Sequence, residues 1–161
     1  AALEQALAER TREGQSGGLL FLDLDHFKAV NDRYGHRHGD HLLQAVAEAI
    51  QENMRDGDLA ARWGGDEFVV LVDTTDPADA HALGQRLAAQ VRAAGETRVD
   101  PNIGFGTSVG FVPVRPQADV DAMIDAADNA LYQAKTGGRG GLAHGAVSAG
   151  ATLSGGLYGR G

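Results

Sequence analysis

The amino-acid sequence predicts a mixed α/β domain, in which helices cover a central sheet that contains antiparallel strands. An apolar run at residues 19–22 indicates a buried strand, and two short apolar segments flank Gly64-Gly65 as in a hairpin. Helical periodicity covers much of the remaining chain. At 161 residues, the chain is long enough for one compact domain and too short for two ordinary ones.

The expected elements follow the order helix, strand, helix, hairpin, helix, strand, helix. Their expected ranges are residues 1–13, 19–25, 42–53, 59–63 paired with 68–72, 78–94, 107–114 and 118–135. Residues 35–39 are expected as a polar loop, and the turn at Gly64-Gly65 as one that needs positive φ angles. The domain is expected to occupy residues 1–141, and residues 142–161 to form a flexible tail rich in Gly, Ala and Ser.

Composition excludes several classes of function. The formal net charge is −8 and no concentrated basic face is evident, so no nucleic-acid polymer is expected as a partner. The chain has no cysteine, which rules out disulfides and thiol nucleophiles and leaves oxygen or imidazole as metal ligands. No apolar run approaches the length of a membrane span and no signal peptide is evident, so a cytoplasmic location is expected.

Acidic residues gather at the ends of two predicted strands. Asp23 and Asp25 close the apolar run and share one face, because side chains alternate along a strand. Asp66 and Glu67 open the second strand of the hairpin. Converging carboxylates with backbone carbonyls nearby suit a hard cation such as Mg²⁺. Either pair alone is more often a set of solvated turn residues, whereas the two pairs together favour a metal site.

A long part of the sequence resembles one protein family. Residues 63–68, Trp-Gly-Gly-Asp-Glu-Phe, contain the signature that gives the GGDEF family its name. Further matches in the family's order and spacing are Phe-Leu-Asp-Leu-Asp-His-Phe-Lys at 21–28, Asn-Asp-Arg-Tyr-Gly-His at 31–36, Gly39-Asp40, Ala-Leu-Tyr-Gln-Ala-Lys at 130–135 and Gly138-Arg139. The resemblance implies a fold like that of nucleotidyl cyclases and polymerase palm domains.

The resemblance implies a diguanylate cyclase, which condenses two GTP molecules into cyclic di-GMP and releases two pyrophosphates. The family's metal ligands match Asp23, the backbone carbonyl of Leu24, and Asp66. Glu67 matches a residue that either binds a second metal ion or activates the attacking 3′-hydroxyl, and both roles stay open. Two Mg²⁺ (or Mn²⁺) ions are expected per GTP. Asp25 matches no ligand, so a structural role as a cap or in a salt bridge is expected.

Two further pairs of residues match nucleotide contacts of the family. Asn31 and Asp40 match the family's guanine-binding residues. A carboxylate can accept hydrogen bonds from the N–H groups of guanine. Taken alone, Asn31 is an ordinary turn residue and Asp40 an ordinary helix N-cap. Lys135 and Arg139 match the cations that hold the terminal phosphates. Without the resemblance they are charges favoured at a helix C-terminus.

Arg55 and Asp58 form an Arg-x-x-Asp motif that ends shortly before the signature, where the family carries an inhibitory site for its product. Arginine can form a bidentate contact with guanine or phosphate, and aspartate can accept guanine N–H groups. Arg86 matches a second arginine of that site. The alternative is a surface ion pair worth roughly 0–1 kcal/mol.

His36, His38 and His41 invite a transition-metal interpretation, which is rejected because they match a nucleotide-binding loop and no cysteine joins them. Trp63 and Tyr132 are expected to be packing residues.

One domain offers half of the site, so a homodimer is expected, with GTP and cyclic di-GMP as ligands. The competing hypotheses are a catalytically weak or silent cyclic di-GMP receptor and a structural interaction domain. The intact signature counts against the silent receptor. The family matches at separate places along the chain count against a structural interaction domain. Gly140-Gly141 replaces a usual Asn-containing stretch, and the given sequence starts after the expected position of the family's opening Asp-x-Leu-Thr-Gly-Leu segment. The fragment is therefore expected to bind ligands better than it turns over GTP.

Overall fold

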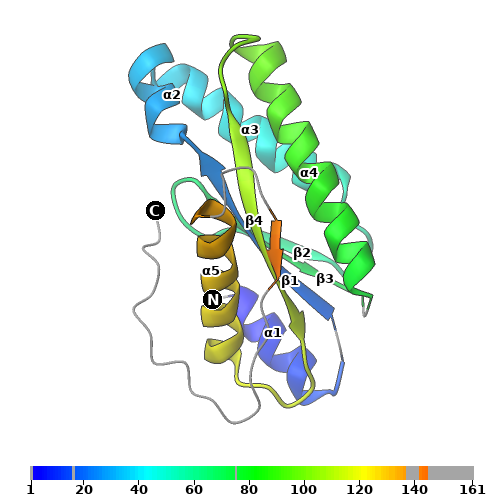
Figure 1. Cartoon of the computed structure of the whole chain (residues 1–161). Helices are drawn as coiled ribbons and strands as arrows, with labels where there is room; N and C mark the ends of the chain where they lie inside the picture. Colours follow the sequence, from blue (N-terminus) through cyan, green and yellow to red (C-terminus); the bar gives the residue numbers. More distant parts are fainter. Residues whose placement is uncertain (1, 16, 75, 137–141, 145–161) are drawn as a thin grey trace.

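A computed structural model of the chain describes residues 2–15, 17–74, 76–136 and 142–144. Helices and strands alternate irregularly along the chain (Figure 1). The helices are α1 (Ala2–Arg12), α2 (Phe27–Tyr34), α3 (His36–Glu52), α4 (Pro77–Arg98) and α5 (Val120–Thr136), and the strands are β1 (Gly17–Asp25), β2 (Leu59–Arg62), β3 (Glu67–Val72), β4 (Gly106–Val114) and β5 (Leu142–His144). The expected class, a central sheet wrapped by helices with a hairpin carrying the signature, is confirmed.

The sheet has the strand order β2-β3-β1-β4-β5. Strand β1 lies in the middle and pairs antiparallel with both β3 and β4, while β2 completes the hairpin with β3. Strand β5 pairs parallel with β4. All nine residues of β1 are buried, which explains why this strand is a nearly continuous apolar run.

Helices cover both faces of the sheet, and the alternating side chains of β1 separate two apolar clusters (Figure 1). Leu20, Leu22 and Leu24 face the cluster that contains residues of α2, α3 and α4. Leu19 and Phe21 face the other cluster, with α1 and α5. Asp23 and Asp25 continue this second face, so the carboxylates follow the apolar side chains toward the α5 side of the sheet.

Helix α5 lies unusually close to the sheet at Gly110 of β4. A Cβ atom at this position would lie 2.4 Å from the backbone N of Leu131 and 2.7 Å from the backbone O of Ala127. The absence of a side chain therefore lets the backbone of α5 rest on β4. This close approach carries the C-terminal end of α5, with Lys135, toward the end of β1.

The region between β1 and α3 differs from the sequence expectation. The expected loop at 35–39 is wrong, because α2 ends at Tyr34 and α3 begins at His36. Gly35 alone separates them, with φ +91°, a value that favours glycine. Helix α2 buries only Val30 among its eight residues, so its sequence gave little apolar periodicity. Because α3 begins at His36, Asp40 is not its N-cap.

Two smaller expectations also changed. The turn glycines Gly64 and Gly65 do not have positive φ angles, so the expectation of a positive-φ hairpin turn is wrong. In the segment expected as a flexible tail, Leu142–His144 forms β5, and residues 145–161 lie outside the described residues. Among the described helices, none is long and apolar enough to cross a membrane.

Candidate functional site

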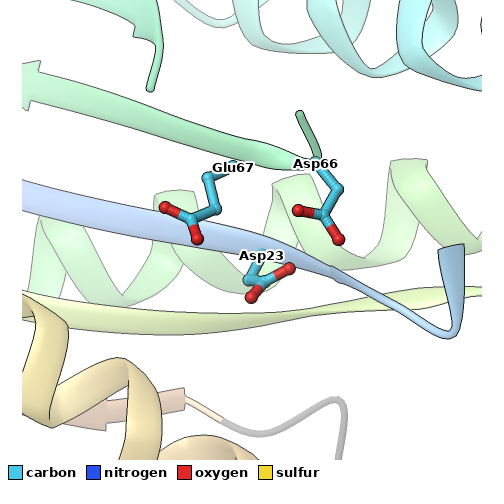
Figure 2. Close-up of side chains that lie close together, drawn as sticks. All are labelled: Asp23, Asp66 and Glu67. Atoms are coloured by element: carbon cyan, nitrogen blue, oxygen red, sulfur yellow. The ribbon is translucent and has the colours of Figure 1, made fainter. Parts of the chain in front are cut away.

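Three carboxylates converge where β1 ends and β3 begins (Figure 2). Asp23 lies near the end of β1, directly opposite Glu67 in the antiparallel register, and Asp66 is the last residue of the hairpin turn. Each side chain offers an oxygen atom, and these oxygens all lie within 4.8 Å of one another. Among the described residues, this is the one group of His, Cys, Asp or Glu side chains that could share a metal ion.

The cluster is set into the protein, since Asp23 is 4% exposed and Glu67 is 3% exposed. Oδ1 of Asp23 is buried and has no hydrogen-bond partner among the described residues. Burial raises the pKa of Asp23 from 3.8 to about 6; a hydrogen bond from Lys135 opposes this rise and the charge of Asp66 adds to it. A buried carboxylate oxygen without a donor is costly, and a bound cation would remove that cost.

Lys135 reaches this cluster from the last turn of α5. Its Nζ donates a hydrogen bond to Oδ2 of Asp23, and the two side chains form a part-buried ion pair. The cation expected to bind phosphate therefore lies beside the metal-ligand candidates. Arg139, its expected companion, lies outside the described residues.

Backbone contacts connect the hairpin turn to β1. The N–H of Leu24 donates to the carbonyl of Asp66 at 3.1 Å, which holds the turn against the end of β1. Asp25 accepts a hydrogen bond of 2.9 Å from Oγ of Ser108 on the neighbouring strand. This strand-to-strand hydrogen bond is a structural contact, of a kind other than the expected cap or salt bridge.

Asn31 of α2 lies against Gly39 of α3, the residue before Asp40. A Cβ atom at Gly39 would lie 1.8 Å from Oδ1 of Asn31, so only glycine leaves room for that amide. Asp40 follows Gly39 directly and is exposed. Sequence analysis noted Gly39-Asp40 as a match but missed the reason for the glycine. A glycine inside a helix costs about 1 kcal/mol relative to alanine, so its presence there was a signal that a neighbouring group needs the space.

A pocket of about 450 Å³ opens beside Asp40, between α3 and the β2–β3 hairpin. Its wall includes Leu43 from α3, Phe68 from β3 and Arg62 from β2. One carboxylate at the end of a largely apolar pocket can orient a planar, hydrogen-bonding base.

The Arg-x-x-Asp motif lies at a second, smaller pocket on the other end of the hairpin. Arg55, Asp58 and Arg86 all line it, together with Asn53. Both carboxylate oxygens of Asp58 accept backbone N–H groups, from Arg55 at 2.9 Å and from Asp73 at 2.8 Å. Nε of Arg86 donates to Asn53 at 2.9 Å. No ion pair joins Arg55 to Asp58 in the described structure, so the simple surface ion pair does not account for the motif.

Sequence analysis missed two arginines that organise these loops. Arg10 of α1 bonds Oδ1 of Asp73 at 3.0 Å and the carbonyl of Gly57 at 3.1 Å, and so fastens α1 to the loop of the Arg-x-x-Asp motif. Arg62 bonds the carbonyls of Gly64 and Gly65. Contacts such as Arg10 with Asp73 join residues far apart in the sequence, and no local pattern indicates them.

The remaining expectations concern histidines and aromatic residues. His36, His38 and His41 belong to α3, and Nδ1 of His38 contacts the carbonyl of Tyr34 at 2.7 Å. Trp63 packs against the α1–α5 cluster, with its ring centroid 5.9 Å from that of Phe21. Tyr132 is 50% exposed, so the expectation that it is a packing residue is wrong.

The fold and its acidic cluster define an α/β domain of the nucleotide-cyclase kind, and comparisons with known proteins give its family. The family profile described as "Diguanylate cyclase, GGDEF domain" matches residues 1–141. The chain belongs to this family.

Similar proteins include larger ones that carry such a domain. The chain is 43% identical over 144 residues to the bifunctional diguanylate cyclase/cyclic di-GMP phosphodiesterase MucR of Pseudomonas aeruginosa, covering 86% of this chain and 20% of MucR. It is 41% identical over 132 residues to the cyclic di-GMP phosphodiesterase NbdA of the same organism, covering 78% of this chain and 16% of NbdA. The chain thus spans a fifth or less of the length of these two relatives.

Among solved structures, the GGDEF domain of DgcB from Caulobacter crescentus, in complex with c-di-GMP, superposes with a TM-score of 0.79. The sequence identity is 29%, and the match covers 89% of this chain and 85% of that one.

The ionisation of Asp23 generates a prediction for the metal-free chain. We expect the Asp23 carboxyl to titrate near pH 6 and Lys135→Met to raise its pKa further, because the lysine hydrogen bond and charge favour the ionised form. Since the folded-state pKa lies above 3.8, the free energy of unfolding should fall as pH rises from about 4 to about 6. NMR titration of the Asp23 carboxyl measures its pKa, with Arg98→Met as the control. An Asp23 pKa in Lys135→Met equal to that of the unmodified chain would contradict the prediction.

Proposed function

We propose that this domain is a diguanylate cyclase that condenses two GTP molecules into cyclic di-GMP and is inhibited by its product. The observation that carries the proposal is the meeting of Asp23, Asp66 and Glu67 within 4.8 Å at the ends of two paired strands. Membership of the diguanylate cyclase family supports it.

The residues present fit a divalent metal site. All three side chains offer hard oxygen ligands, and the buried Oδ1 of Asp23 needs a partner. Asp23, Asp66, Glu67 and the carbonyl of Leu24 would hold two Mg²⁺ or Mn²⁺ ions. When bound, such ions neutralise the triphosphate and promote attack by the 3′-hydroxyl. The proximity of the Glu67 carboxylate to Asp23 favours its role as a metal ligand over that of a general base.

The chain's own side chains orient the nucleotide. Asp40 accepts hydrogen bonds from the N–H groups of guanine in the pocket beside α3. The Asn31 amide, for which Gly39 leaves space, makes the second contact with the base. Lys135 leaves Asp23 to contact the terminal phosphates, with Arg139 as its partner. Gly65 has an open surface, where a Cβ would meet nothing within 4 Å, so phosphates can approach the backbone of the turn.

The reaction needs two domains facing each other, each holding one GTP. The 3′-hydroxyl of one nucleotide attacks the α-phosphorus of the other, the bond to pyrophosphate breaks, and the reciprocal attack closes the ring. Two transfers release two pyrophosphates. A single domain offers one nucleotide site of this kind, so the active form is a homodimer.

Product inhibition is assigned to the pocket of Arg55, Asp58 and Arg86. The two guanidinium groups can contact guanine edges or phosphates of cyclic di-GMP. Asp58 is held by two backbone N–H groups, and its oxygens keep lone pairs for guanine N–H donors. The structure of the DgcB GGDEF domain in complex with c-di-GMP supports ligand binding by domains of this fold.

A silent cyclic di-GMP receptor is the second candidate, because the similar protein NbdA is a cyclic di-GMP phosphodiesterase. The complete carboxylate cluster counts against it. Incubating the chain with GTP and Mg²⁺, and analysing the nucleotides formed, distinguishes the two functions.

The metal assignment predicts that Asp66→Asn and Asp23→Asn abolish cyclic di-GMP formation while the fold is retained. A neutral amide is a poor ligand for a hard cation, and the cluster loses one of its charges. Product is measured by chromatography after incubation with GTP and Mg²⁺, and folding by circular dichroism. Asp119→Asn, in the loop before α5, serves as the matched control. Undiminished product from either cluster variant would overturn the assignment.

Guanine recognition predicts that Gly39→Ala lowers the preference for GTP over ATP. The added Cβ would displace the Asn31 amide, and each lost contact to the base costs about 1–3 kcal/mol, so GTP affinity should fall about tenfold. The fold should survive, because alanine favours a helix over glycine. Calorimetry with non-hydrolysable GTP and ATP analogues measures the preference, and Asn31→Ala should reproduce the loss. An unchanged preference in Gly39→Ala would refute this role.

The inhibitory site predicts that Arg55→Ala weakens cyclic di-GMP binding and relieves product inhibition without lowering the initial rate. Arg55 lines a pocket that includes none of the three carboxylates, so substrate contacts are kept. Calorimetry gives the product affinity and initial-rate assays give the inhibition, with Arg98→Ala as the control at a surface ion pair. If product affinity is the same in Arg55→Ala and the unmodified chain, the site is wrongly placed.

A further inference from the structure

The turn that carries Asp66 has almost no packing of its own. Gly64 and Gly65 have no side chains, and a Cβ at Gly65 would meet nothing within 4 Å. The nearest atoms to a Cβ at Gly64 would be those of Glu67, at 3.6 Å. Glycine has the largest conformational freedom to lose on ordering, so such a turn needs hydrogen bonds to hold one conformation.

Arg62, the last residue of β2, supplies hydrogen bonds on the open side of the turn. Its Nε donates to the carbonyl of Gly64 at 3.1 Å and to that of Gly65 at 3.2 Å, and Nη2 also donates to Gly65. The guanidinium is planar and presents its donors in a rigid geometry that lysine cannot reproduce. The register of the hairpin, with Arg62 opposite Phe68, fixes the base of this side chain.

The opposite side of the turn is held by β1, through the hydrogen bond from Leu24 N–H to the carbonyl of Asp66. The hairpin itself closes with bonds from the backbone N–H groups of Trp63, at 2.8 Å, and Gly64, at 3.4 Å, to the carbonyl of Glu67. Without the contacts of Arg62, the two glycines between these anchors keep no hydrogen bond to a side chain among those described. Asp66 would then be tethered at its own carbonyl and free to move at the preceding peptide.

The same arginine lines the pocket beside Asp40. Its side chain is exposed rather than buried in the core, and in the described structure no acidic residue forms an ion pair with it. Its contacts with the two carbonyls are therefore its specific interactions. One side chain touches both the candidate base pocket and the turn that bears a carboxylate of the cluster.

We propose that Arg62 is a positioning residue: its guanidinium holds the Gly64-Gly65 turn so that Asp66 meets Asp23 and Glu67 in the geometry a divalent cation requires. The proposal rests on the proposed function for its catalytic consequence. The order of the turn and the affinity for a cation can both be measured without turnover.

The experiment compares Arg62→Lys with Arg98→Lys, a matched change at an exposed arginine of α4 that is paired with Glu48. Lysine keeps the charge and the aliphatic stem but loses the planar set of donors. In the metal-free protein, ¹⁵N relaxation gives the order parameters of Gly64, Gly65 and Asp66. In the same samples, calorimetry gives the affinity for Mn²⁺, and thermal unfolding confirms that both variants are folded.

We expect Arg62→Lys to lower the order parameters of the turn alone and to weaken Mn²⁺ binding about tenfold, the effect of losing a hydrogen bond that involves a charged group. Arg98→Lys should change neither. A turn that loosens without weaker Mn²⁺ binding, or weaker binding without a looser turn, overturns the positioning role, as does no change in either. Arg62→Gln repeats the test should the lysine variant not fold.

Turnover is measured separately with GTP and Mg²⁺. A positioning role predicts that Arg62→Lys lowers kcat more than it changes KM, because the aliphatic wall of the pocket is kept. If the unmodified chain forms no cyclic di-GMP, the proposed function fails, while the order parameters and Mn²⁺ affinities still decide the role of Arg62.

Discussion

The antiparallel register between β1 and β3 is the constraint on which the candidate site depends. It places Asp23 directly opposite Glu67, and the turn that precedes Glu67 then brings Asp66 to the same end of the sheet. A slip of one residue would move one of these carboxylates to the opposite face, among the leucines that pack against α3 and α4. The apolar clusters on both faces oppose such a slip, because the slipped strand would exchange its two sets of side chains. The hydrophobic core therefore sets the geometry of the charged site.

Burial gives this geometry an electrostatic cost. Asp23 is placed where its charge is poorly solvated, beside two further acids, and Lys135 offsets the repulsion only in part. Additional positive charge beside the three carboxylates would consequently stabilise the cluster. A cation bound at this cluster would offset that unfavourable free energy, which is why the cluster supports the proposed metal site.

Much of the site could be predicted because its signals are local. The run of Leu19 to Leu22 followed by alternating acids identified the central strand, and the hairpin signature identified its neighbour. The corner of α2 and α3 could not be predicted, because Val30 is the only residue that α2 buries. The φ angles of Gly64 and Gly65 also escaped prediction, since a longer turn accommodates them without the positive values of a two-residue turn. The role of Gly39 depends on a side chain eight positions earlier, which only folding brings near.

The close approach of α5 to Gly110 has a consequence for how this domain tolerates mutation. Position 110 lies within the sheet and touches no carboxylate of the cluster, yet any side chain there would push the backbone of α5 outward. Lys135 would move with that helix, so its distance from Asp23 depends partly on the lack of a Cβ atom at Gly110. A substitution at Gly110 could therefore impair the site in a protein whose every candidate ligand is intact. Inspection of the signature residues alone would not reveal such a change.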